Sequence, residues 1–150
     1  MAVLRETPYA KFNFLVDLGT GNAKGPDAGF SEIALPDVSV DIFAYRNGND
    51  PENAARLVAG NVHYSTITLK RGQIGSLSLY QWFDQVRKGD PAAKRNIAIQ
   101  LLSEDRAEVV VTWKLSRALP AKYTFSNLDA LGREVAVEAL ELAFEQLEME

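Results

Sequence analysis

Residues 67–91 read ITLKRGQIGSLSLYQWFDQVRKGDP, and this stretch decides the expected fold. Its first residues alternate, so that Ile67, Leu69 and Arg71 share one face of an extended chain, as in a β-strand. Glycines on both sides of the following Gln-Ile pair permit backbone angles that other residues resist. The stretch therefore predicts a strand, a tight break, a short helix and a stop.

The helix is predicted at about 77–88 because apolar residues recur there at helical spacing. Its apolar face consists of Leu79, Trp82, Phe83 and Val86. Ser76 or Ser78 can cap its start by accepting a hydrogen bond from a free backbone N–H. Gly89 suits a left-handed C-cap, and Pro91 prevents continuation. A helix this short is unstable alone, so we expect its apolar face to dock on a sheet.

The composition limits the class of protein. A chain of 150 residues predicts one domain, residues 1–150, and the net charge of −4 argues against a nucleic-acid binder. There is no cysteine, so disulfides and thiolate metal sites are excluded. The N-terminus lacks a signal-peptide pattern, and no apolar run reaches membrane-spanning length. We therefore expect a soluble protein made in the cytoplasm.

The region before the central stretch predicts strands separated by loops. Alternation predicts strands at 9–18 and 30–35, and from 38 to 44 Val38, Val40, Ile42 and Ala44 share one face. The glycine-rich segment 19–29 resembles a phosphate-binding loop only superficially, because it lacks a Lys-Ser/Thr pair and a following helix; a hairpin loop is expected. Residues 46–62 show little strand pattern and predict an exposed excursion, which is often functional.

After the helix, two alternating runs at 97–101 and 109–115 flank a polar turn and predict an antiparallel hairpin. Pro120 indicates an edge or a bend, after which 122–125 can resume the strand. The last stretch, 133–150, is ambiguous. Glutamates at steps of four and three indicate an amphipathic helix, although the same residues also fit a strand.

No catalytic or cofactor constellation is visible. His63 is the only histidine, which excludes a histidine-rich metal site, and a surface or strand-edge role is expected for it rather than a catalytic one. The candidate carboxylates occupy helix-end and turn positions, where they normally stay hydrated. Trp82 and Trp113 lie on apolar faces and are expected in the core. The residues therefore predict a protein that is not an enzyme and holds no cofactor or metal.

The order of the segments is distinctive. YAKFNFLVDLG, GFSEI before Pro36, YRNGN, then ITLKRG with GSLSLYQWFDQVRKGD, and a terminal EVAVEALELAFEQLEME follow one another. Together they resemble the tail tube family of contractile phages, which also supplies the inner tubes of extracellular contractile injection systems. The family is related in fold to the type VI secretion tube protein. The resemblance covers nearly the whole chain.

The resemblance implies a mainly β (α+β) fold, in which two antiparallel sheets form a sandwich or partial barrel with one flanking helix. It also implies homohexameric rings that stack into a hollow tube. The implied partners are other copies of the chain, the sheath, baseplate or hub and cap proteins, and a cargo effector or DNA in the lumen without specific nucleic-acid readout. The target membrane is met only on injection, after assembly into a phage tail or tail-like particle.

The resemblance also bears on two segments. It implies that the ambiguous C-terminal segment is a strand, since partner pairing can override local propensity. It places the 46–62 excursion next to the adjacent ring, which gives the hypothesis that Arg46, Asn47, Gly48, Asn49 and Asp50 mediate ring stacking. Deletion of 48–58 is then expected to leave rings without tubes.

Two other functions stay open at this point. A tube-initiator subunit at the baseplate of the same machine would share the fold. A small-molecule-binding β-barrel, from a different class, would need a monomer with a closed apolar pocket.

Overall fold

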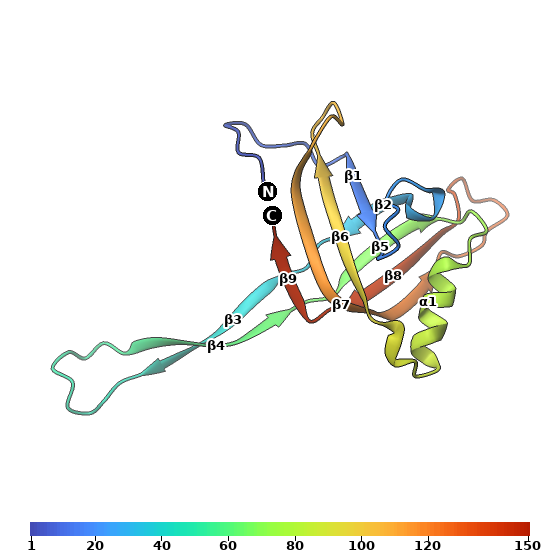
Figure 1. Cartoon of the computed structure of the whole chain (residues 1–150). Coiled ribbons are helices and arrows are strands. Elements are labelled where there is room, and N and C mark those ends of the chain that lie inside the picture. Colours follow the sequence, from blue (N-terminus) through green and yellow to red (C-terminus); the bar gives the residue numbers. More distant parts are fainter.

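The computed structural model describes residues 1–150, and its body consists of two twisted antiparallel sheets that share one long strand and curl into a partial barrel (Figure 1). Its strands run in the order β1-β6-β7-β8-β5-β2, and β9 pairs with β7 beside this path. They are β1 (Phe14–Asp17), β2 (Phe30–Ala34), β5 (Ile67–Gly72), β6 (Arg95–Leu102), β7 (Val109–Phe125), β8 (Val137–Ala143) and β9 (Gln146–Met149).

The 17-residue strand β7 joins two sheets. Its first part pairs with β6 and β9, and its second part pairs with β8. Between these parts Arg117 has a φ of 54°, and the register shifts between Pro120 and Lys122. Proline has no N–H for the ladder, so the strand bends here, as the sequence predicted. The expected architecture of two antiparallel sheets and one flanking helix is confirmed.

The single α-helix, α1 (Ser78–Arg87), is followed by the 3₁₀ turn η2 (Pro91–Ala93). Leu79 and Trp82 are buried in the core, and the Trp82 indole N–H donates to the Ala93 carbonyl at 2.7 Å. At the helix start the Ser76 Oγ accepts from the backbone N–H of Ser78 at 3.3 Å, as predicted for a serine cap, although the N-cap position itself is Leu77. Gly89 has a φ of 76°, as a left-handed helix end requires. No helix of the chain has the length and apolarity to cross a bilayer.

The core lies between the two sheets and α1. In β5, Ile67, Leu69 and Arg71 are all buried, so the predicted alternation is confirmed. Arg71 is compensated by the equally buried Glu138 on the neighbouring strand β8. The other large side chains of the core cluster are Val16, Leu18, Phe30, Leu79, Trp82, Ile97, Ile99, Leu115, Leu140 and Leu142.

The ambiguous C-terminal stretch forms strands, so the strand prediction is confirmed. β8 lies between β5 and β7 and is hydrogen-bonded on both edges. Glu138, Leu140 and Leu142 all face the core, where Glu138 meets Arg71. Pairing on two edges outweighs the helical spacing of the glutamates because it gives β8 backbone hydrogen bonds to both neighbouring strands.

The interpretation of 46–62 as a loop is wrong over its second half. β3 (Val38–Tyr45) and β4 (Arg56–Tyr64) form a separate two-stranded hairpin, and only 46–55 is loop. The register shifts between Val40 and Ile42, where Gly60 and Asn61 together oppose Asp41. This β-bulge changes the parity of the apolar residues along β4, which hid the strand from a simple alternation test.

Three smaller expectations are corrected. Segment 19–29, which contains η1 (Pro26–Ala28), is no hairpin loop, because it connects β1 of one sheet to β2 of the other. The first strand begins at Phe14 rather than Tyr9. The alternation expected over 109–115 is interrupted at the start of β7, where Val110 is buried and Val109 is exposed, because the register shifts opposite the end of β6.

Candidate assembly interface

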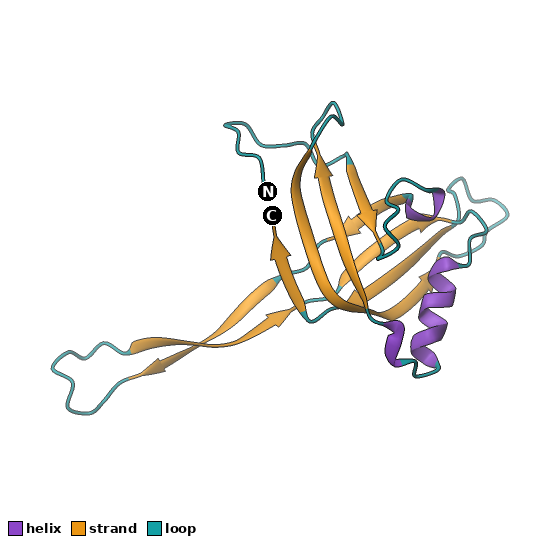
Figure 2. Ribbon diagram, in the orientation of Figure 1, coloured by secondary structure: helices purple, strands orange, loops and turns teal.

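The hairpin β3–β4, called the arm below, projects away from the body (Figure 2). Its base is fixed to the body. The rings of Tyr64 and Phe144 pack against each other with centroids 5.1 Å apart. Asp37 and Ser65, next to the two arm strands, exchange hydrogen bonds of 3.0 and 2.7 Å that hold these strands together at the base. The arm therefore leaves the body at a fixed position but contributes no residue to the core cluster.

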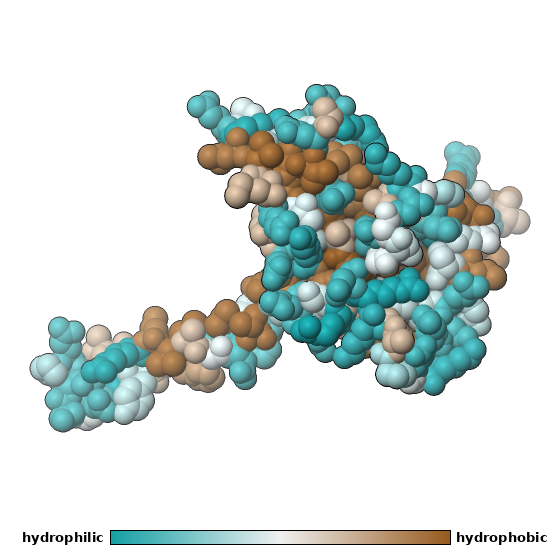
Figure 3. All heavy atoms as spheres, viewed as in Figure 1, coloured by the Kyte–Doolittle hydropathy of each residue, from teal (hydrophilic) through white to brown (hydrophobic).

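One face of the arm is entirely apolar. The register places on it Val38, Val40, Ile42, Ala44, Leu57, Ala59, Val62 and Tyr64. Ile42 is 59% and Leu57 is 76% exposed, and Figure 3 shows apolar side chains along the shaft of the arm. A two-stranded hairpin is marginal in water by itself, and a continuous exposed apolar surface marks an interaction site. This face is therefore suited to be covered by another molecule.

The opposite face of the arm is mixed. His63, the only histidine, lies within β4, and its Nε2 is 2.8 Å from a carboxylate oxygen of Asp41 on β3. The ring of Phe43 covers Gly60, where a Cβ would lie 2.3 Å from a ring carbon. An aromatic ring over a strand glycine compensates for its missing side chain. These contacts stiffen the shaft without help from the body.

The structure brings the predicted stacking residues together at the tip of the arm. Arg46 donates to the backbone carbonyls of Glu52 at 2.8 Å and Asp50 at 3.1 Å. The Asp50 carboxylate accepts from the Asn47 backbone N–H at 2.9 Å. Arg46, Asn47 and Asp50 thus order the loop internally. Gly48 and Asn49 are exposed and free to contact a partner.

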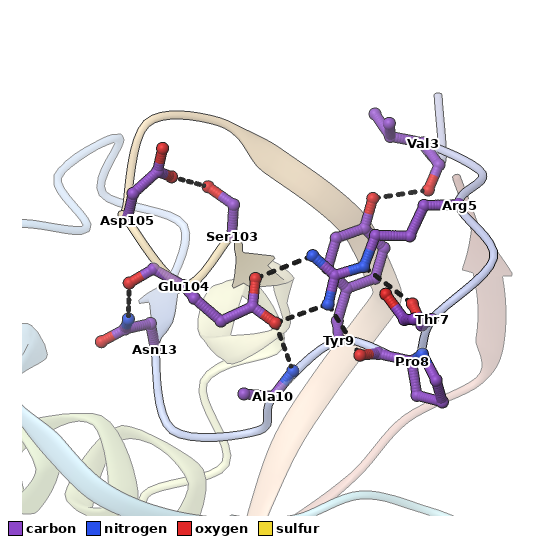
Figure 4. A network of polar contacts seen from close by, with 10 residues as sticks. All are labelled: Val3, Arg5, Thr7, Pro8, Tyr9, Ala10, Asn13, Ser103, Glu104 and Asp105. Atoms are coloured by element: carbon purple, nitrogen blue, oxygen red, sulfur yellow. Dashed lines mark hydrogen bonds and ion pairs between the residues drawn. The ribbon is translucent and has the colours of Figure 1, made fainter.

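The N-terminal segment is fastened to the turn between β6 and β7 by a polar network (Figure 4). Both oxygens of Glu104 accept from the Arg5 guanidinium, at 2.5 and 2.9 Å, and one also accepts from the Ala10 N–H at 3.1 Å. The Tyr9 hydroxyl donates to the Val3 carbonyl at 2.9 Å. The hydrogen bonds from Arg5, followed by that from Ala10, lower the pKa of Glu104 to about 2.

Two cavities have the size of a ligand site. One, of about 550 Å³, lies between the open edges of β1 and β2 and is mainly apolar, with Phe14, Ile33 and Trp113 in its wall. The other, of about 250 Å³, lies against the 19–29 loop and holds Arg95. No three His, Cys, Asp or Glu side chains come together as metal ligands.

The comparisons with known proteins point to one family. The model of the family described as T4-like virus tail tube protein gp19 matches residues 10–148. No match was found among curated proteins.

Solved structures are similar over almost the whole chain. A chain in the cryo-EM structure of the anti-feeding prophage baseplate, 6-fold symmetrised, is 28% identical, with 97% of each chain covered and a TM-score of 0.80. One in the PVC sheath-tube complex of an extracellular contractile injection system is 27% identical, with 97% of this chain and 93% of that chain covered and a TM-score of 0.81. Hcp1 from Flavobacterium johnsoniae, 13% identical with 91% and 93% covered and a TM-score of 0.53, shares the fold.

Proposed function

Because the chain belongs to the T4-like virus tail tube protein family, we propose that it is a structural subunit of the inner tube of a contractile injection system or phage tail-like particle. The observation that carries this proposal is the arm, whose apolar face is exposed in the isolated chain. A subunit that is always surrounded by copies of itself can present such a face, whereas a monomer would be liable to aggregate.

Copies of the chain form homohexameric rings that stack into a hollow tube. The similarity to a chain from a 6-fold symmetrised baseplate supports this ring size. Ring closure also protects the free edges of β1, β2 and β9. Sheath, baseplate and cap proteins are the further partners, since similar chains come from a sheath-tube complex, a baseplate and a cap. The tube conducts cargo when it is driven through a target membrane.

The chain acts as a building element and not as an enzyme. It is made in the cytoplasm and assembled into the particle there. The similarity to the baseplate chain also favours a second candidate, a tube-initiator subunit that starts the stack. The two candidates differ in polymerisation, since only the main tube subunit stacks without limit.

The tip of the arm contributes to ring stacking through Arg46, Asn47, Gly48, Asn49 and Asp50. The internal hydrogen bonds of the loop support this role, because a loop ordered before contact loses less entropy on binding.

Negative-stain electron microscopy of the purified protein, with light scattering on the same sample, tests the assignment. Six-fold rings or stacked tubes are expected, and a monomer at every concentration would refute the tube function. Replacing 47–55 by Asn-Gly tests the tip while keeping both arm strands, and it is expected to leave rings without tubes. Lys24→Ala, in an exposed loop of the body, is the matched control. Tubes of ordinary length from the shortened loop would refute the role of the tip.

A further inference from the structure

Residues 1–10, called the strap below, lie along the turn between β6 and β7 (Figure 4). The Arg5 guanidinium organises the strap. It donates to the carbonyls of Thr7 and Pro8, each at 2.7 Å, and lies 3.9 Å from the centroid of the Tyr9 ring. The same guanidinium donates through two nitrogens to the carboxylate of Glu104 in the turn. One side chain therefore both sets the shape of the strap and fastens it to the body.

The strap covers part of one edge of β7. Along this edge β7 is paired with β9, and Thr112 exchanges two further hydrogen bonds of 2.8 Å with Glu150. Two residues earlier on β7, the Val110 carbonyl accepts from the Val3 N–H of the strap at 2.9 Å. The N-terminus lies beside the end of β9 in Figure 1, and its ammonium adds to the effect of Lys114 in lowering the pKa of Glu150. The strap therefore continues the row of backbone partners that β9 begins.

Polar contacts hold the strap in place, and it has little apolar anchoring. None of its residues belongs to the hydrophobic core cluster, and Leu4 is 97% exposed. In the ion pair that fastens it, the Arg5 and Glu104 side chains are 33% and 39% exposed. A gap of about 670 Å³ separates the strap from the turn. Segments with few buried apolar contacts open at a low cost in free energy, so the strap can open while β7 stays folded.

We propose that the strap is a releasable cover: it closes the edge of β7 at Val110 in the free subunit, and its opening exposes this edge to a strand of a second copy. An uncovered strand edge offers unpaired N–H and C=O groups to other chains. The neighbouring apolar side chains Val109 and Met149 are exposed and can pack on an incoming strand. The inference concerns the free subunit and goes beyond the proposed tube function.

Arg5 is the residue whose loss opens the strap. Its guanidinium makes the contacts within the strap and the ion pair to the turn, and it takes no part in the core. Arg5→Ala is therefore expected to open the strap without unfolding the body. Lys11→Ala removes the same charge from an exposed position just beyond the strap, so it is the matched control.

Hydrogen exchange of the free subunit tests whether Arg5 holds the strap. The amides of Val3 and Ala10 are hydrogen-bonded only while the strap is closed. In Arg5→Ala their exchange is expected to be about tenfold faster or more, because hydrogen bonds to a charged group are lost. The amides of 113–116, within β7, are expected to exchange as in the wild-type protein, and Lys11→Ala is expected to change neither set.

A reversible closure tests whether the strap covers an association edge. Arg5→Cys combined with Glu104→Cys supplies the only two thiols, because the chain has no cysteine of its own. A cleavable thiol-reactive cross-linker, applied at low protein concentration, ties the strap to the turn, and a reductant frees it again. Analytical ultracentrifugation then measures the concentration at which copies associate. The freed form is expected to associate at a concentration about tenfold lower than the linked form, because apparent affinity scales with the population of the open state.

Two results would overturn the inference. Equal exchange of the Val3 and Ala10 amides in Arg5→Ala and in the wild-type protein would show that Arg5 does not hold the strap. Equal association of the linked and freed forms would show that the strap covers no association edge. Neither result bears on the tube function, which is judged from the rings and tubes of the wild-type protein in the electron microscope.

Discussion

Removing the carboxylate of Glu138 is expected to be the most damaging single change within the body of the subunit. Glu138 and Arg71 are each 1% exposed, and the Arg71 Nε and Nη2 lie 2.7 and 2.5 Å from the same carboxylate oxygen. Arg71 also donates to the Asp27 carbonyl at 2.7 Å, and the Tyr123 hydroxyl donates to Glu138. Burial, and then this hydrogen bond, raise the pKa of Tyr123.

The size of the effect follows from burial. Glu138→Ala leaves the Arg71 guanidinium in the core without a counter-charge, which costs about 3–5 kcal/mol. With a urea m-value of about 2 kcal/mol per M, the unfolding midpoint falls by about 1.5–2.5 M. The double variant Arg71→Met with Glu138→Leu removes both charges and fills the volume. It also loses the charge-assisted hydrogen bonds to the Asp27 carbonyl and the Tyr123 hydroxyl, but it leaves no buried charge unpaired and is expected to be more stable than the single variant.

Urea unfolding followed by the fluorescence of Trp82 and Trp113 measures these values. The comparison is made at a concentration where light scattering gives a monomer mass, because assembly would add its own stabilisation. Tyr123→Phe is the control that removes one hydrogen bond and keeps the ion pair. A Glu138→Ala cost below about 1 kcal/mol, or a double variant less stable than the single one, would refute the assignment of the energy to an uncompensated buried charge.

Two further predictions concern the N-terminal network and the end of the helix. The folded pKa of Glu104 is about 2, below its ordinary value of 4.5, so its contribution to stability is present above about pH 4.5 and is lost as the pH falls toward 2. Arg5→Ala is expected to make the urea midpoint less sensitive to acid between about pH 6 and pH 3, and an unchanged slope would contradict this role. Gly89 has a φ of 76° with open space around it, so Gly89→Ala is expected to cost about 1 kcal/mol through backbone strain alone, with Lys88→Ala as the control.

The spacing of apolar residues was sufficient to predict a strand or a helix where one face of that element is buried. The alternation of Ile67, Leu69 and Arg71 and the apolar spacing of α1 both describe the structure, because each side chain's position follows from the backbone period. The helix start was predicted to within one residue, and Ser76 accepts from the first helical N–H, although the N-cap residue is Leu77. The second strand of the arm was not predicted, because the β-bulge at Gly60 shifts the alternation of its apolar residues by one position.

The sequence by itself determined the strand and helix of 67–91, the bend at Pro120 and, through resemblance, the family. It placed the stacking hypothesis at Arg46–Asp50, whose role is still a prediction. Only the tertiary structure decided which segments lie side by side. The apolar face of the arm is assembled from two strands, and the strap reaches Glu104 through Arg5, 99 positions earlier in the chain. An isolated pattern cannot tell an apolar side chain that enters the core from one left outside it. That outcome depends on which strands pair and where their edges fall, which is a property of the whole sheet.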